Sequence, residues 1–365
     1  MAKLLLMYSI TINPSIKSKS MTKGSIRRIF ADDIRNSIRS SSIESVEQFL
    51  QLLGEPTWIF FPGKSSSQCR VVTTLLHGNE PSGSHGVLRL IKENYIPAYD
   101  SWILIASIDA ALQEPVFSRR YIEEEQDLNR CFNMPSDTKI ERLAEMIVKD
   151  ISSFKPYAVI DVHNTSGAGP GFCVSTSTST IMDQLACIFT NSLVITDIRL
   201  NALMEVDFGC PVITVECGGN HSELSHLFSY NGIHKFLSVE DLSHIEVTSD
   251  LQHYWHPLRL ELKKGYTLDY GKSPGENADI TLCHSVEFQN FGTTIPEKRL
   301  GWLGSKGLDC LLLKDTDNNN LVEEYFENKD GKLHTKKHLH LFMVTTVKTI
   351  AETDCLFYLS SAETS

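Results

Sequence analysis

Two residues with metal-binding side chains stand three apart at the end of an apolar segment. The run 71–76 is typical of a buried strand, and it leads directly into a turn that contains His77 and Glu80. An imidazole and a carboxylate at this spacing can reach one Zn²⁺ from the same turn if a third ligand comes from elsewhere. The pair alone is weak evidence, because a second such pair, His284 and Glu287, occurs in a chain with 13 histidines.

Two further apolar segments also end in polar residues. Val159–Val162 is followed by His163, and Val212–Val215 is followed by Glu216 and then by a Gly-Gly pair at 218–219. Taken singly, each is explained equally well by a hydrogen-bonded residue at a strand boundary. In α/β sheets, ligands bind at the carboxyl ends of strands. If the three segments are neighbours in one sheet, their terminal polar residues converge, and together they indicate a metal site.

The residue types predict hydrolytic chemistry. Two histidines and one glutamate leave a fourth position open for water, which is the composition of a catalytic zinc site and differs from that of a structural one. A carboxylate beside that water, for which Glu216 is the candidate, can take its proton and pass it to a leaving nitrogen. The bond cleaved would be an amide or an ester.

The segment 118–130 lies between these motifs and carries several charges. An arginine there can stabilise a developing oxyanion, and the pair Asn129-Arg130 can hold a substrate carboxylate by hydrogen bonds. The alternative is a charged helix or loop with internal salt bridges, which the acidic run 123–125 favours.

Helical and strand patterns alternate around these motifs. We expect one helix from Ile34 to Leu53 that Asp32 or Asp33 caps, and further helices after Gly83 and from 140 to 154. Strands are predicted at 58–61, 70–76, 102–108, 157–162 and 212–215. Strands that alternate with helices predict an α/β domain with a largely parallel sheet.

Length and patterning predict two domains. A chain of 365 residues exceeds the size at which one core usually stops growing. From residue 251 the pattern changes to short alternating segments such as 258–262. We therefore expect a catalytic domain over residues 21–250 and a β-rich domain over residues 251–365. The Lys/Ser-rich residues 1–20 are expected to form a disordered extension, and Met21 is an alternative start.

Composition excludes several classes of partner. The net charge of −11, without a basic stripe, argues against nucleic acid, and the longest apolar runs fall short of a membrane span. Nine scattered cysteines without a Cys-x-x-Cys pair are typical of reduced thiols, so a cytoplasmic location is expected. A small-molecule substrate is the simpler partner, and a homo-oligomer is left open.

Four motifs, in this order, resemble the succinylglutamate desuccinylase/aspartoacylase family of zinc amidohydrolases. They are residues 77–80, the arginine-rich segment with 120–122 and 127–130, residues 161–165, and residues 215–216. The resemblance implies a three-layer α/β/α zinc-carboxypeptidase-like domain with a mixed, largely parallel sheet, and a smaller C-terminal β-rich domain. It also implies one zinc ion per chain.

The resemblance carries roles over to particular residues. It implies His77, Glu80 and His163 as zinc ligands, Glu216 as general base and acid, Arg120 at the oxyanion, and Asn129, Arg130 and Asn164 as substrate-binding residues. The resulting hypothesis is hydrolysis of an N-acyl amino acid or a related small amide that bears a carboxylate. A zinc carboxypeptidase acting on peptide C-termini shares the ligands, and a non-catalytic metabolite-binding relative shares the fold.

Two departures from the family pattern affect substrate and oxyanion recognition. The stretch from Arg120 to Asn129 is longer than in aspartoacylase, so Arg119 and Arg120 compete for the oxyanion role. The segment 203–209 has no arginine where aspartoacylase places a second clamp, and carries acidic residues instead. The second departure argues against an N-acyl aspartate or a succinylglutamate as substrate.

Overall fold

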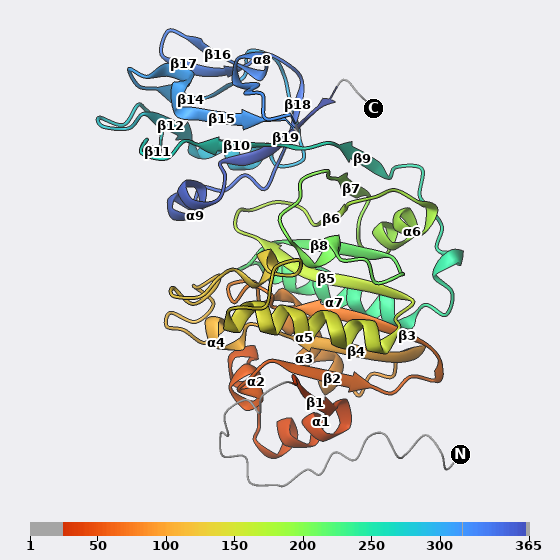
Figure 1. Cartoon of the computed structure of the whole chain (residues 1–365). Coiled ribbons are helices and arrows are strands. Elements are labelled where there is room, and N and C mark those ends of the chain that lie inside the picture. The colour runs from red at the N-terminus through yellow and green to blue at the C-terminus, as the bar shows by residue number, and fades with distance from the viewer. Residues whose placement is uncertain (1–24, 316, 363–365) are drawn as a thin grey trace, which may run out of the picture.

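The computed structural model describes residues 25–315 and 317–362 (Figure 1). The expected extension over residues 1–20 and the alternative start at Met21 lie outside the described residues. Within the described ranges, no helix is long and apolar enough to cross a membrane.

A nine-stranded mixed sheet forms the larger part of the molecule, with the order β1-β2-β4-β3-β5-β8-β6-β7-β9. Neighbouring strands run parallel except at two pairs, β2 with β4 and β6 with β8. The strands are β1 Arg27–Phe30, β2 Thr57–Phe61, β3 Ser65–Thr74, β4 Tyr99–Ile105, β5 Ala158–Thr165, β6 Phe172–Ser175, β7 Ser192–Ile195, β8 Val212–Gly219 and β9 Gln252–Trp255.

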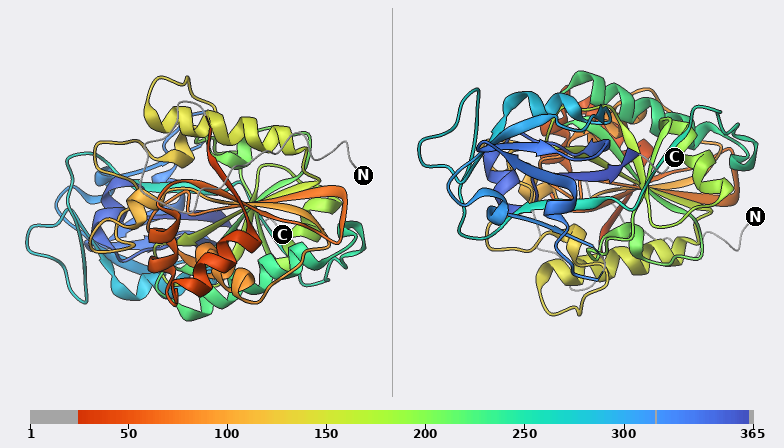
Figure 2. Two further views of the ribbon diagram at one scale, coloured as in Figure 1. Left: turned by 90° about the horizontal axis from the view of Figure 1, so that it is seen from below. Right: turned by 90° about the horizontal axis from the view of Figure 1, so that it is seen from above.

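Helices cover both faces of this sheet (Figure 2). On one face, α5 packs with its apolar stripe against Trp58, Val71 and Trp102. On the other face, α1, α2, α3, α6 and α7 enclose the larger core. These helices are α1 Ala31–Ser40, α2 Val46–Leu53, α3 Ser82–Lys92, α5 Lys139–Phe154, α6 Thr180–Phe189 and α7 Glu223–Ser238, with the short α4 at Ile108–Ala111. The predicted three-layer α/β/α class with a largely parallel sheet is confirmed.

The single helix that we predicted over 34–53 is wrong, because the chain breaks between α1 and α2. Ser42 adopts a positive φ of 51°, and Ser45 starts α2 with a capping box whose partner is Gln48. Asp32 and Asp33 lie in the first turn of α1 and do not form its N-cap. The apolar spacing continues across the break because both helices pack on the same core, so the pattern conceals it.

The three strands that lead into the chemical motifs are adjacent and parallel. β5 lies between β3 and β8, and the register pairs Thr74 with Val162 and His163 with Glu216. β5 is buried along its whole length, as expected for a central strand covered on both faces. The sheet therefore brings the carboxyl ends of these strands to one place on its edge.

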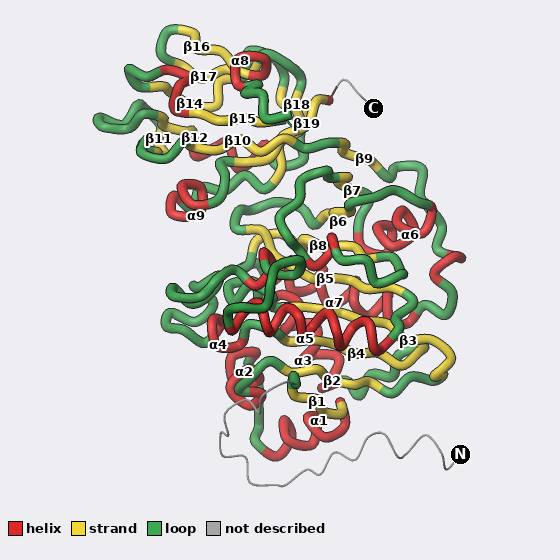
Figure 3. Tube along the Cα trace, in the orientation of Figure 1, coloured by secondary structure: helices red, strands yellow, loops and turns green. Residues whose placement is uncertain are grey.

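A smaller β-rich part follows, and Figure 3 shows that strands and loops dominate it. It contains two five-stranded sheets, ordered β13-β18-β19-β10-β15 and β11-β12-β14-β17-β16, with one shared apolar core. Its elements are β10 Leu258–Leu262, β11 Leu268–Gly271, β12 Ile280–Cys283, β13 Thr293–Thr294, β14 Arg299–Leu303, β15 Leu311–Lys314, α8 Val322–Tyr325, β16 Phe326–Lys329, β17 Lys332–Thr335, β18 Leu339–Phe342, α9 Lys348–Thr353 and β19 Phe357–Ser361. The predicted domain boundary after residue 250 stays a prediction. β9, which follows this boundary in the chain, pairs with β7 in the larger sheet.

Candidate metal centre and its pocket

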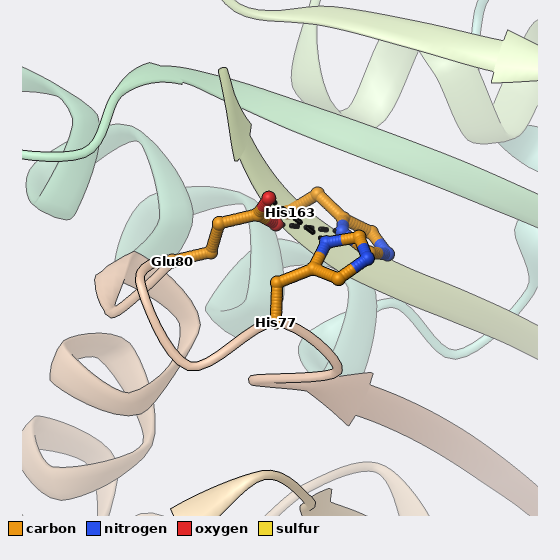
Figure 4. A group of neighbouring side chains, drawn as sticks. All are labelled: His77, Glu80 and His163. Atoms are coloured by element: carbon orange, nitrogen blue, oxygen red, sulfur yellow. Dashed lines mark hydrogen bonds and ion pairs between the residues drawn. The ribbon is translucent and has the colours of Figure 1, made fainter. Parts of the chain in front are cut away.

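His77, Glu80 and His163 form a compact buried group (Figure 4). Nδ1 of His77 lies 2.9 Å from Oε1 of Glu80, and Nδ1 of His163 lies 2.7 Å from Oε2 of the same carboxylate. The potential ligand atoms all lie within 4.8 Å of one another, and each residue is at most 5% exposed. Two imidazole nitrogens and one carboxylate oxygen are a donor set that a divalent metal ion can use.

The turn after β3 places two of these side chains. Leu75 has a positive φ of 57°, and the chain then turns through Gly78 so that Glu80 N–H donates to His77 C=O over 3.2 Å. A Cβ at Gly78 would lie 2.5 Å from the backbone nitrogen of Ala111, so no larger residue fits there. The turn therefore depends on close backbone contact with α4.

Each histidine is held on its far side by a second carboxylate. Nε2 of His77 lies 2.9 Å from Asp127 Oδ1, and Nε2 of His163 lies 2.7 Å from Asp161 Oδ2. Asp161 is fully buried and also accepts a hydrogen bond from the Thr73 hydroxyl over 2.6 Å. Such carboxylates fix the ring orientation of metal-binding histidines, and here they leave both Nδ1 atoms directed at Glu80.

The electrostatics of the group favour a cation. Burial lowers the pKa of His163, but the neighbouring Asp161 and Glu80 carboxylates outweigh it and hold this pKa well above its ordinary value. Burial likewise raises the pKa of Glu80, yet His77 and His163 hold it far below the ordinary range. Three carboxylates thus surround two imidazoles, and their excess negative charge suits a divalent ion.

Glu216 lies beside the group without belonging to it. It ends the apolar part of β8 and is 8% exposed, and its Oε2 atom is buried without a hydrogen-bond partner among the described residues. Burial, with a contribution from the Glu80 charge, raises its pKa to about 7 against the opposing effect of His163. A buried carboxylate with this pKa and an unpaired oxygen can exchange protons near neutral pH.

The arginine-rich segment reaches the same site. Arg120 donates from Nε to Asp127 Oδ2 over 2.8 Å, and its Nη1 lies 3.6 Å from Glu80 Oε1. Arg119 is exposed at the rim of the pocket. Of the two competing arginines, the structure therefore brings Arg120 to the His77–Glu80–His163 group.

Two asparagines of the expected substrate set are engaged within the protein. Oδ1 of Asn129 accepts from Leu203 N–H over 2.9 Å, and its Nδ2 lies 3.4 Å from His163 Nε2. The Asn164 amide accepts from Ser82 N–H and donates to Ser82 Oγ and to Gly218 C=O over 2.8 to 3.0 Å. Asn164 also donates its backbone N–H to Glu80 Oε2 over 3.2 Å.

A cavity of about 710 Å³ opens above these residues. His77, Glu80, His163, Glu216 and Arg130 line it together with residues of the smaller β-rich part, among them Arg259, Phe342 and Tyr358. The sequence analysis missed this last group, because nothing local in those segments indicates which strand they face. The change of pattern near residue 250 was the sole signal that a second unit could contribute to the site.

The second histidine–glutamate pair of the sequence does not form a metal group. Among residues 25–315 and 317–362, His77, Glu80 and His163 form the one group whose ligand atoms meet the geometry for an ion. His284 and Glu287 lie in a short 3₁₀ helix, where Glu287 bonds Ala168 N–H and Thr346. The spacing of this pair alone thus does not make a site.

Solved structures share this fold. A succinylglutamate desuccinylase/aspartoacylase from Rhodobacter sphaeroides matches with a TM-score of 0.53 and 14% identity, over 84% of this chain and 89% of that chain. The ectoine utilization protein EutE (DoeB) from Ruegeria pomeroyi, in a product-bound structure, matches with a TM-score of 0.50 and 13% identity, over 84% and 85%. No family model and no curated protein sequence matches the chain.

The comparison confirms the resemblance at the level of the fold. The chain has the architecture of the succinylglutamate desuccinylase/aspartoacylase structure, over most of the length of both chains. Its mixed sheet and its β-rich C-terminal part are both included in that agreement. On this fold the protein carries a buried His-Glu-His group that could hold a metal ion.

Proposed function

We propose that the protein is a zinc-dependent hydrolase that cleaves the amide bond of an N-acyl amino acid or of a related small amide. The observation that supports this most directly is the buried His77–Glu80–His163 group with the unpaired Glu216 carboxylate oxygen beside it in one cavity. The order of the four sequence motifs and the shared fold give independent support.

His77, Glu80 and His163 would hold the zinc ion, with Asp127 and Asp161 fixing the two imidazoles. Zinc in such a site supplies Lewis acidity and lowers the pKa of water. Because each histidine has a carboxylate on Nε2 and turns Nδ1 toward Glu80, the donor atoms are already assembled for one ion.

Glu216 is the proposed general base and acid. Its carboxylate would take a proton from the attacking water and return it to the departing amide nitrogen, and a pKa of about 7 suits both steps. Arg120 is proposed to stabilise the oxyanion that forms on the amide carbonyl. Its salt bridge with Asp127 holds the guanidinium next to Glu80.

The substrate carboxylate is assigned to Arg130, with Asn129 next to it. Arg130 lines the cavity and donates Nη1–H to the Asn129 carbonyl over 2.9 Å, which leaves other N–H groups for a ligand. The side-chain amide of Asn164 is hydrogen-bonded to Ser82 and Gly218. We therefore propose that Asn164 affects substrate binding indirectly, by holding the turn that contains Glu80. The free state of all nine cysteines suits the proposed cytoplasmic location.

A single assay tests the activity. The zinc-loaded protein is incubated with N-acyl amino acids and, separately, with dipeptides and longer peptides, and release of free amino acid is measured. We expect hydrolysis of N-acyl amino acids that is lost on chelation and restored by zinc. Preferential release of C-terminal residues from peptides would instead identify a carboxypeptidase. Stoichiometric zinc without any hydrolysis would identify a binding protein.

A further inference from the structure

The floor of the cavity changes from polar to apolar along the sheet. Glu216 pairs in register with His163 on one side and with Phe172 on the other, so these three side chains project from the same face. Two residues further along β6, Val174 pairs with Val194 of β7. Phe172, Val174 and Val194 all line the cavity. An apolar surface therefore begins directly beside the proposed base.

The walls above this floor also contain apolar side chains, and Thr196 and Thr214 line the cavity with them. The chain before β8, which has no arginine over residues 203–209, contributes Leu200 and Met204 to the cavity. Neither of its acidic residues lines the cavity: Glu205 accepts hydrogen bonds from the backbone N–H groups of residues 200–202, and Asp207 accepts one from Gly209 N–H. The smaller β-rich part adds Phe342, which lines the cavity but is only 1% exposed, because it packs in one buried apolar cluster with Phe172 and Val194. The smaller β-rich part stands next to the β7–β9 edge of the sheet (Figure 1).

Two of the four arginines that line the cavity are already paired with carboxylates of the protein, which limits the number of acidic groups that a substrate can place there. Arg120 is paired with Asp127 and Glu80. Arg259 is paired with Asp354 over 2.5 Å and with Glu261 over 2.8 Å. Arg130 forms no ion pair within 4.0 Å with any residue in the described part of the chain, and Arg119 lies exposed at the rim. Within the described residues, Arg130 is thus the one half-buried guanidinium of the cavity without an ion pair, and Arg119 is a further, exposed one.

We infer that the substrate is an amide with a single carboxylate whose remaining substituent is an apolar chain or ring lying on Phe172, Val174 and Val194. This inference rests on the proposed function and specifies its substrate class. The carboxylate binds Arg130, the scissile bond lies at the metal-binding group, and the apolar substituent extends along the floor toward Met204 and Phe342. A second carboxylate in that position would lose its hydration against apolar groups without gaining a cation.

The apolar substituent can belong to either side of the bond, and two series of substrates distinguish the sides. One series lengthens the acyl group on glycine from acetyl to butyryl, hexanoyl and octanoyl. The other keeps N-acetyl and varies the amino acid through glycine, valine, leucine and phenylalanine. In the series that reaches the floor, kcat/KM should rise about fourfold per methylene until the surface is covered.

Acidic substrates are the reference for both series. N-Acetylaspartate and N-succinylglutamate should be hydrolysed at least about tenfold less efficiently than the best apolar substrate. A flat response in both series, or a preference for either acidic substrate, overturns the inference and leaves the proposed hydrolase activity standing.

The variant Met204→Gln tests the wall with little change in shape. It should lower kcat/KM about tenfold for the best apolar substrate and by less than twofold for N-acetylglycine. Met146→Gln is the matched control, because Met146 is also half-buried but lies on α5 outside the cavity. Val174→Thr provides a second, isosteric change in the floor. Equal effects of Met204→Gln on the apolar and the small substrate would contradict the placement of the apolar substituent next to Met204.

A binding measurement separates this inference from the proposed activity. If no amide is hydrolysed, calorimetry with the zinc-loaded Glu216→Gln protein compares N-hexanoylglycine with N-acetylglycine. Tighter binding of the longer ligand would then support the apolar surface, while the missing hydrolysis counts against the proposed activity alone. Equal binding, or none, overturns the inference too.

Discussion

Replacing Glu216 with glutamine should reduce catalysis and stabilise the metal-free protein at the same time. The substitution keeps the shape of the side chain but removes its ionisation. If Glu216 transfers protons, kcat should fall by at least about 10²-fold while zinc content is unchanged. Metal analysis and steady-state kinetics on the same preparation check both statements.

The stability effect follows from burial of the carboxylate. The pKa of Glu216 rises from 4.5 to about 7 in the folded protein. Between pH 4.5 and about pH 7, the folded state therefore keeps a proton that the unfolded state has already lost. The ionised form therefore costs stability that grows as the pH rises from about 4.5 to about 7 and amounts to about 3 kcal/mol above it. Glutamine avoids this cost, as protonated glutamate does.

The assay is urea denaturation of the chelator-treated proteins. At pH 8, Glu216→Gln should be more stable than the unsubstituted protein by about 3 kcal/mol, and at pH 5 by about 1 kcal/mol. Glu124→Gln, which removes the same charge from an exposed site, is the control for net charge. A stability difference that is the same at both pH values would refute the argument from burial. A near-normal kcat with zinc bound would show that Glu216 is not the base.

Three substitutions around the proposed zinc site lead to distinct expectations. His163→Ala should abolish stoichiometric zinc binding, because two remaining ligands cannot complete the site, and an undiminished zinc content would contradict the assignment. Glu80→Ala should be inactive mainly because it binds zinc weakly, so excess zinc should partly restore activity. A loss of activity that excess zinc does not reverse would contradict the role of Glu80 as a ligand. Asp161→Asn should weaken zinc affinity about 10- to 100-fold in a competition titration with a chromophoric chelator, and unchanged affinity would remove Asp161 from the support of His163.

The sequence by itself determined the parts of the site that are local along the chain. His77 and Glu80 lie in one turn directly after an apolar run, and this context together with their spacing indicates that both can reach one ion. Apolar runs that end in a polar residue likewise mark His163 and Glu216, although β5 and β8 continue to Thr165 and Gly219. A parallel sheet places such ends together, and the adjacency of β3, β5 and β8 follows that rule.

Only the tertiary structure decided which distant segments complete the site. The antiparallel insertion of β6 next to β8 sets Phe172 beside Glu216, although an apolar residue at a strand start carries no signal of that neighbour. The packing of the smaller β-rich part likewise brings Arg259 and Phe342 into the cavity. The physical reason is that a turn constrains its residues through a few covalent bonds, whereas contacts between segments far apart in the chain depend on how all the intervening elements pack.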